Sequence, residues 1–303
     1  MRKQFSNYIE QISEQNEKLV FITGDLGYGA LENVKSKLGN RFINAGVAEQ
    51  NMIGMAAGMA YKGFQVICYS IAPFVVYRCL EQIRNDVCFH NLPVYVVGNG
   101  GGYGYGIMGS SHHAIEDLAA LSGLPNMSCY IPSFSEDLKI SLDEIFDNNT
   151  PAYLRLGLGK QMPEDSNITN YGIEIKNNPN SRLTIISQGP VANNLVEALK
   201  LLDEIVEIDV FTILKMPLIK LPNDIKTSVL KTRNVLTIEE HISIGGIASM
   251  VSFAINTEGI KIDKYISLYA QGYPDNLYGS QNFHQKISGL DSLNISNIIK
   301  SFL

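Results

Sequence analysis

The chain of 303 residues lacks the features that mark several classes of protein. Its 24 Lys and Arg residues are outnumbered by 30 Asp and Glu residues, so the formal net charge is −6 and no basic footprint for nucleic acid exists. The first residues contain no apolar segment typical of a signal peptide. No apolar run approaches the roughly 18 residues that a membrane span needs. We therefore expect a cytoplasmic protein that binds neither nucleic acid nor membrane.

Cysteine is scarce and follows no functional pattern. The four cysteines, at positions 68, 79, 88 and 129, form no C-x-x-C pair and no zinc-binding spacing. We expect reduced thiols without a catalytic or metal-binding role, as is usual in the cytosol. The chain also shows no internal repeat and no low-complexity tract. With 45% hydrophobic and 18% charged residues, the composition is that of a packed globular protein.

Short apolar runs alternate with helical patterns along most of the chain. Strands are predicted at 19–23, 41–44, 66–69, 94–98, 129–131, 152–156, 183–187, 208–212 and 235–238. Helices are predicted at 48–61, 74–89, 111–122 (capped by Ser111), 135–147, 191–203, 222–231 and 244–257. This alternation predicts an α/β fold of two domains, 1–160 and 182–303, each a mainly parallel sheet flanked by helices. The polar segment 161–181 indicates a linker between them.

A glycine-rich loop offers one misleading signal. Residues 104–109 read G-Y-G-I-M-G, which satisfies the G-x-G-x-x-G pattern of dinucleotide-binding folds. However, no Asp or Glu stands about 20 residues further on to bind a ribose, and the loop that begins at Val97 is too long for the tight turn of that motif. A nicotinamide-dependent oxidoreductase is therefore the weakest of the functional alternatives.

The run N-A-G-V-A-E-Q-N-M, which leads into I-G-M-A-A-G-M-A-Y-K-G, carries the strongest functional signal. Glu49 stands at the start of a predicted helix, where an acid favourably meets the helix dipole in many proteins without further function. The whole run, however, resembles the pyrimidine-binding domain of the transketolase superfamily. The resemblance implies that Glu49 is catalytic and hydrogen-bonds N1′ of the aminopyrimidine of thiamine diphosphate. That chemistry requires a carboxyl group held away from bulk water, which can share a proton with the ring.

The same resemblance extends to both sides of the glutamate. Upstream, a T-G-D-L segment implies that Asp25 and Leu26 lie against the cofactor. Downstream, Phe74 and Tyr77 fall on aromatic positions that line the aminopyrimidine, and Ile71 falls on a third that is aromatic in many relatives. Without the resemblance, the two aromatic residues would be interpreted as helix core and the aspartate as a turn cap.

The glycine-rich loop resembles a second transketolase run, G-V-G-x-D-G-P-T-H-Q-P-I-E-H-L-A-A-L. Here it reads G-Y-G-I-M-G-S-S-H-H-A-I-E-D-L-A-A-L. The match implies that His112 is the active-site histidine, which contacts substrate oxygens and stabilises developing charge. His113, which replaces a glutamine, is a second candidate for substrate binding. Because the family's loop acid falls on Met108, the substrate need not be that of a pentose-phosphate enzyme.

The segment P-A-Y-L-R-L-G-L-G-K resembles the end of the pyrimidine domain, where several relatives carry an arginine for the substrate phosphate. That position is Leu158 here. Arg155 and Lys160 are therefore alternative candidates for substrate binding, although solvated surface cations are an equally good interpretation.

The second predicted domain contains V-L-T-I-E-E-H-I-S-I-G-G-I-A-S, which resembles the C-terminal domain of transketolases. Glu239, Glu240 and His241 could indicate a metal or acid–base cluster. The resemblance implies instead a mainly structural domain that helps to form the dimer, so no metal site is expected in this chain.

One expected part of a transketolase is missing. Full-length members hold the cofactor diphosphate through a G-D-G…N motif and a divalent metal, and the only Gly-Asp here belongs to the T-G-D-L segment. No Walker loop is present either. The resemblance therefore implies a separate N-terminal subunit that carries the diphosphate-binding domain and holds Mg²⁺ or Ca²⁺. The active site would lie between the chains, in an α2β2 assembly.

These residues lead to one main functional hypothesis and several alternatives. The main hypothesis is a transketolase-like subunit that transfers a two-carbon ketol unit from a ketose donor to an aldehyde acceptor. A thiamine-dependent synthase of the 1-deoxyxylulose-5-phosphate type, or a 2-oxo-acid dehydrogenase β subunit, would instead begin by decarboxylating an oxo acid; the E-E-H run argues against the latter. A non-catalytic assembly subunit is a further alternative, against which the joint presence of Glu49, Phe74 and His112 argues.

Overall fold

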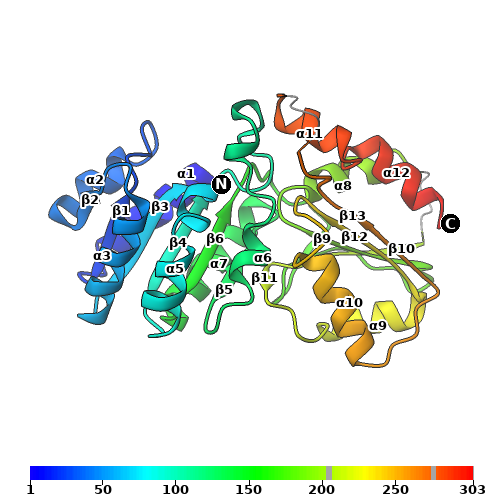
Figure 1. Cartoon of the computed structure of the whole chain (residues 1–303). Coiled ribbons are helices and arrows are strands. Elements are labelled where there is room, and N and C mark those ends of the chain that lie inside the picture. The colour runs from blue at the N-terminus through cyan, green and yellow to red at the C-terminus, as the bar shows by residue number, and fades with distance from the viewer. Residues whose placement is uncertain (203–206, 274–277, 303) are drawn as a thin grey trace.

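The computed structural model describes residues 1–202, 207–273 and 278–302. Two mainly parallel sheets lie side by side, each covered by helices (Figure 1). The predicted α/β class, with two helix-flanked sheets, is confirmed. None of the described helices is long and apolar enough to cross a membrane.

The first sheet has seven strands in the order β11-β5-β6-β4-β3-β1-β2. Its parallel strands are β1 (Leu19–Thr23), β2 (Phe42–Asn44), β3 (Gln65–Ile71), β4 (Val94–Asn99), β5 (Ser128–Tyr130) and β6 (Ala152–Leu156), and β11 (Lys215–Met216) pairs antiparallel with β5. Because the parallel strands share one direction, their carboxyl ends lie at one edge of the sheet, which is where open α/β sheets bind ligands.

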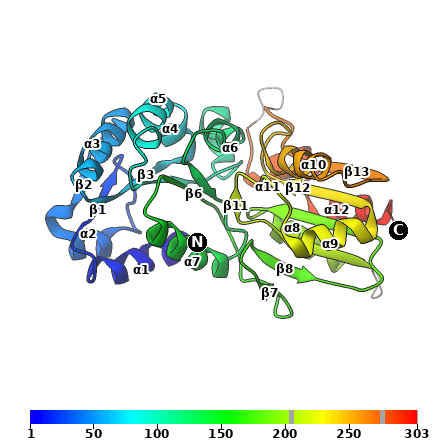
Figure 2. The same cartoon turned by 90° about the horizontal axis from the view of Figure 1, so that it is seen from below.

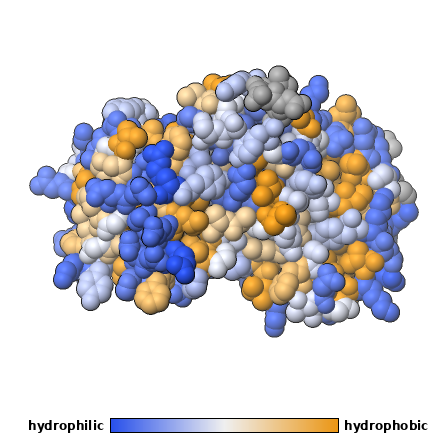
Figure 3. All heavy atoms as spheres, in the orientation of Figure 1, coloured by the Kyte–Doolittle hydropathy of each residue, from blue (hydrophilic) through white to orange (hydrophobic). Residues whose placement is uncertain are grey.

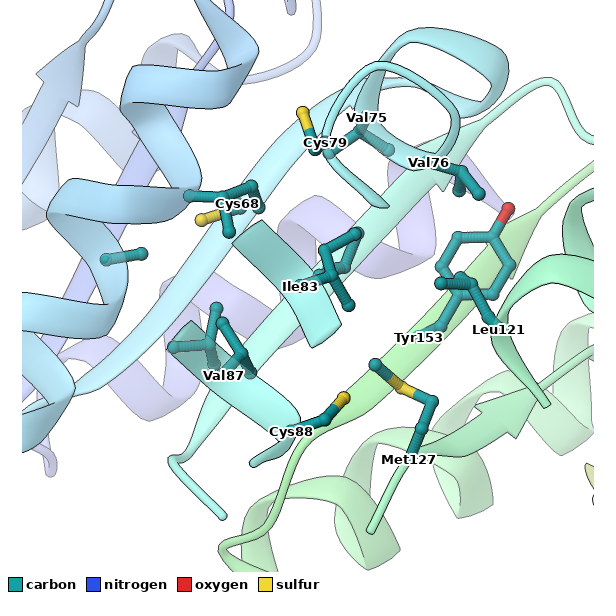
Figure 4. Close-up of a cluster of buried hydrophobic side chains, with 14 of the residues drawn as sticks. Cys68, Val75, Val76, Cys79, Ile83, Val87, Cys88, Leu121, Met127 and Tyr153 are labelled. Carbon is teal, nitrogen blue, oxygen red and sulfur yellow. The ribbon is translucent and has the colours of Figure 1, made fainter. Parts of the chain in front are cut away.

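Two layers of helices enclose the first sheet (Figure 2). One face packs against α1 (Arg2–Ser13), α2 (Glu32–Leu38) and α7 (Ser135–Asn148). The other packs against α3 (Glu49–Tyr61), α4 (Ala72–Val76), α6 (Asp117–Leu121) and a π-helical turn, Ile83–Cys88. Figure 4 shows part of this second cluster, in which Cys68, Cys79 and Cys88 lie among apolar side chains. Burial raises the pKa of the Cys88 thiol to about 12, so the buried thiols stay protonated.

The second sheet has the order β13-β12-β9-β10-β8-β7. Its strands are β7 (Asn167–Ile168), β8 (Ile173–Lys176), β9 (Leu183–Gln188), β10 (Ile208–Thr212), β12 (Asn234–Glu239) and β13 (Lys264–Leu268). The helices are α8 (Ala192–Leu199), α9 (Asn223–Thr232), α10 (Ile247–Thr257), α11 (Gln281–Ile287) and α12 (Ser292–Lys300). The segment 161–181, interpreted from sequence as a linker, supplies the hairpin of β7 and β8 to the edge of this sheet.

Two predicted helices are shorter or more broken in the structure. The helix predicted over 74–89 is divided into α4, α5 (Leu80–Gln82) and the π-helical turn, because Cys79 leaves helical geometry. The helix predicted to begin at Ser111 is wrong, since Ser110–His112 is a single 3-10 turn and α6 begins at Asp117. The backbone of Ala114 pairs with Gly102 and so is unavailable to a helix. The predicted end of the helix over 191–203 lies outside the described residues.

Candidate active site

Glu49 is a buried carboxylate at the carboxyl edge of the first sheet. It is the first residue of α3 and only 1% of its surface is exposed. Ser70 Oγ, at the end of β3, donates to its Oε1 at 3.0 Å, and Arg78 Nη1 lies 2.7 Å from its Oε2. Gly24, at the end of β1, allows this close approach, since a methyl group there would lie 3.2 Å from Ser70 Oγ. The side chain is thus sheltered from water, as the hypothesis for Glu49 requires.

Arg78 links this carboxylate to an aromatic ring, which in turn contacts a histidine. The guanidinium carbon of Arg78 lies 4.6 Å from the centre of the Phe74 ring, within the range of a cation–π contact. The His112 ring meets the Phe74 ring edge-on, with 5.0 Å between ring centres. Both Phe74 and His112 are partly exposed. The fold therefore brings together Glu49, Phe74 and His112 from three separate segments of the chain.

The residues that follow β1 line a cavity of about 400 Å³ together with residues of α2 and β2. Asp25 adopts a left-handed backbone (φ 56°), and its Oδ1 accepts a hydrogen bond from Asn44 Nδ2 at 2.8 Å. Leu26 lines the same cavity. Ile71 ends β3, one residue beyond Ser70. Asp25, Leu26 and Ile71, three of the predicted cofactor residues, therefore lie at the carboxyl ends of strands β1 and β3.

Tyr77 follows α4 and is held by an acidic residue. Its hydroxyl donates to Oε2 of Glu116 at 2.9 Å, and the backbone N–H of Glu116 donates to the same hydroxyl at 3.2 Å. Burial, together with the negative charges of Asp117 and Glu116, raises the pKa of Tyr77, so the phenol is protonated. Its ring remains 37% exposed and is available to a ligand at this edge.

Three other candidates for substrate binding lie in different environments. Arg155 is buried, with Nε 3.0 Å from Asp117 Oδ2, and Tyr153 donates to the same oxygen at 2.6 Å. His113 is also buried, and burial lowers its pKa, so it is neutral at pH 7. Lys160 is exposed. Arg155 and His113 are therefore buried within the protein, and Lys160 is the exposed residue of the three.

The E-E-H run joins the two halves of the molecule. Glu240 accepts hydrogen bonds from the backbone N–H of Tyr103 at 2.6 Å and from Gln281 at 2.9 Å. Glu239 accepts from the first two N–H groups of α10 at 2.7 and 2.9 Å, although burial raises its pKa to about 7. His241 Nε2 accepts from the backbone N–H of Ala119 at 3.3 Å. Since all three side chains are buried and engaged, the run anchors loops and a helix.

Sequence reasoning missed four polar residues of this site: Ser70, Arg78, Glu116 and Tyr273. Glu116 lies inside the recognised histidine motif, and Arg78 directly follows a predicted aromatic position, so both carried a weak signal. Tyr273, which donates to Glu116 Oε1 at 2.6 Å, lies 157 positions away and carried none.

The donor set fits one end of thiamine diphosphate. A buried carboxylate beside a partly exposed aromatic ring suits a planar heterocycle with a ring nitrogen. In contrast, no group of three or more His, Cys, Asp or Glu that could hold a metal occurs within residues 1–202, 207–273 and 278–302. The described residues around Glu49 are thus of the kinds that would suit the pyrimidine end of the cofactor.

Comparison with known families agrees with this geometry. Residues 1–161 match the family described as "Transketolase, pyrimidine binding domain", and residues 172–269 match "Transketolase, C-terminal domain". Since the first match alone covers more than half of the chain, the protein belongs to the transketolase family.

Similar proteins include both split and full-length enzymes. A subunit of the apulose-4-phosphate transketolase of Actinobacillus succinogenes is 29% identical over 86% of this chain and 85% of its own length. A structure described as "Split gene transketolase, inactive beta4 tetramer" has a TM-score of 0.79 at 25% identity and covers 100% of this chain and 97% of its own. "1-deoxy-D-xylulose-5-phosphate synthase 2" of Geobacter sulfurreducens is 28% identical over 98% of this chain, which spans 48% of that protein.

Proposed function

We propose that this member of the transketolase family is one subunit of a thiamine-diphosphate-dependent enzyme that transfers a two-carbon ketol unit from a ketose to an aldehyde. The observation that carries the proposal is the buried Glu49 carboxylate, next to Phe74 and His112, at the carboxyl edge of the first sheet. Folding by itself does not require a buried charge at this position, because an apolar residue there would avoid the cost of desolvation.

Each residue has a distinct part in holding the pyrimidine. Phe74 offers a ring face for stacking, and Tyr77 and Ile71 line the same edge. Asp25 and Leu26 close the site beside β1. Glu49 holds or accepts a proton at N1′ of the ring, because each carboxylate oxygen keeps a second lone pair beside its present partner. When bound, the cofactor supplies the carbon nucleophile that attacks a carbonyl group.

His112 is positioned for work on the substrate. It is partly exposed and packs edge-on against Phe74, with Ser111 Oγ 3.1 Å from its Nδ1, so its Nε2 is left for another partner. An imidazole there can donate to a carbonyl or hydroxyl oxygen as negative charge develops. The exposed Lys160 is a candidate for an anionic group of a sugar substrate, and Leu158 leaves the arginine position of relatives without a cation.

We further propose that the active enzyme contains a partner chain with the diphosphate-binding domain and Mg²⁺ or Ca²⁺, in an α2β2 assembly. Large apolar side chains are exposed in the loops that follow β1, β2, β4 and β6: Tyr28, Val47, Ile107, Met108 and Leu158. All of these loops lie at the edge that carries Glu49. Apolar groups gathered around a site support a docking surface. On the face drawn in Figure 3, hydrophobic and hydrophilic groups lie side by side over both halves of the chain.

A second candidate function is a synthase reaction that begins by decarboxylating pyruvate. It is supported by the similarity to the Geobacter sulfurreducens synthase and by Met108 at the position of the family's loop acid. Release of carbon dioxide from pyruvate, with no ketol transfer between sugars, would favour this second reaction.

The experiment is an assay of the complex with its partner chain, supplied with thiamine diphosphate and Mg²⁺. We expect ketol transfer by the wild type and a loss of about 100-fold or more in Glu49→Gln, because the amide can no longer share a proton with the ring. Glu81→Gln, at an exposed glutamate on the same side of the sheet, is the matched control and should behave as wild type. Full activity of Glu49→Gln would refute the assigned role.

A further inference from the structure

A carboxylate at the edge of the site is shared by two tyrosines from different halves of the chain. Glu116 Oε2 accepts from the Tyr77 hydroxyl at 2.9 Å, and its Oε1 accepts from the Tyr273 hydroxyl at 2.6 Å. The 2.6 Å bond from Tyr273 lies in the range typical of charge-assisted O–H···O⁻ bonds, which are stronger than neutral ones, and the bond from Tyr77 is longer. Both oxygens of the acid therefore have a phenol as partner.

Tyr77 depends on this acid for its position. It follows the last residue of the short helix α4, and 37% of its surface is exposed, so packing alone does not fix the ring. Its hydroxyl both donates to the Glu116 carboxylate and accepts from the Glu116 N–H. These two bonds set the direction of the ring that is predicted to line the aminopyrimidine.

Tyr273, in turn, is held by an aromatic cluster that joins the two halves. Its ring stacks on His113, with 5.9 Å between ring centres and 19° between planes. The His113 ring lies 5.1 Å from that of Tyr103 and 4.7 Å from that of His284. The Tyr103 hydroxyl also donates to the carbonyl of Gly272, the residue before Tyr273, at 3.1 Å. Although 51% of its surface is exposed, Tyr273 therefore has a ring contact and a backbone anchor beside its bond to the acid.

We propose that Tyr273 is a positioning residue of the cofactor pocket, which acts through Glu116 to fix the ring of Tyr77 against the aminopyrimidine. The inference rests on the proposed function, because it assumes that thiamine diphosphate binds at this edge. It assigns to the C-terminal half a direct part in the site, beyond its expected structural role.

The test measures the affinity of the complex with its partner chain for thiamine diphosphate, by calorimetry in the presence of Mg²⁺. Tyr273→Phe removes only the hydroxyl and keeps the stacking on His113. We expect the dissociation constant to rise about fivefold, as for the loss of one hydrogen bond. Tyr77→Phe should weaken binding by at least as much, and the double variant no further than Tyr77→Phe alone, because the two residues act in series.

Two further readouts separate positioning from a merely structural contact. In the assay, the KM for the cofactor should rise more in Tyr273→Phe than kcat falls. Tyr278→Phe, at a ring that is 71% exposed, is the matched control and should bind the cofactor as the wild type does. If Tyr273 had only a structural role, Tyr273→Phe would instead lower the melting temperature of the cofactor-free complex and leave the dissociation constant for thiamine diphosphate unchanged.

Each outcome decides the inference. If Tyr273→Phe binds the cofactor as tightly as the wild type, or if its effect adds fully to that of Tyr77→Phe, the inference is overturned while the proposed function stands. If the wild-type complex binds no thiamine diphosphate, the proposed function fails and the inference with it.

Discussion

Replacing Arg78 by Met tests how much the ion pair with Glu49 contributes to the stability of the chain. The two side chains are 2.7 Å apart, and 1% of the glutamate but 42% of the arginine is exposed. Removing one member of a fully buried pair costs about 3–5 kcal/mol, whereas an exposed pair contributes about 0–1 kcal/mol. Since water reaches one partner only, we expect Arg78→Met to lower the free energy of unfolding of the chain by about 2 kcal/mol.

The variant keeps the other contact of the side chain. Met has an unbranched apolar stem that can still cover the Phe74 ring, so the loss reports chiefly on charge. At roughly 2 °C for each kcal/mol in a chain of this size, the melting temperature should fall by about 4 °C. Thermal unfolding followed by circular dichroism on the chain alone measures this shift.

A double variant and a control make the measurement specific. In Glu49→Gln/Arg78→Met no charge is left unpaired, so the two substitutions together should cost less than the sum of their separate effects. Arg84→Met removes an exposed arginine that contacts the side chain of the neighbouring Asn85, and it should change little. An Arg78→Met chain that melts with the wild type, or strictly additive effects, would refute the reasoning.

Three further predictions concern the stability of the chain. The pKa of Glu239 is about 7 in the folded state against an ordinary 4.5, so the folded state holds the proton more tightly and the free energy of unfolding falls as the pH rises from 4.5 to 7. The free energy of unfolding of Glu239→Gln should not fall in this way, so it should gain about 3 kcal/mol relative to the wild type over this pH range. Parallel pH profiles of the two proteins in denaturant titrations would contradict this. In Gly102→Ala the added methyl group would meet the Glu240 carboxylate at a φ of +65°, so the free energy of unfolding should fall by roughly 2 kcal/mol in the same titrations. An unchanged free energy of unfolding would contradict this. Arg155→Met leaves the fully buried Asp117 unpaired and should cost about 3–5 kcal/mol, so an unchanged urea midpoint would disprove the ion pair's importance.

Much of the fold was predictable because short apolar runs and amphipathic repeats are local properties. The strands β1, β4 and β6 lie where those runs predicted them, and α3 begins at Glu49. The helices α1 and α2 and the hairpin of β7 and β8 were missed, because weakly patterned polar segments gain their structure from packing against a sheet.

For the candidate site, the sequence alone determined which side chains to examine, since Glu49, Phe74 and His112 stand in recognisable runs. Only the tertiary structure decided their surroundings: Arg78 pairs with Glu49, Arg155 pairs with Asp117, and His113 is buried. The physical reason is that burial and hydrogen bonding depend on which distant segments meet, as when a tyrosine 157 positions along the chain donates to Glu116. A local pattern specifies an element and its faces, but the partner of each polar group is chosen only when those faces pack.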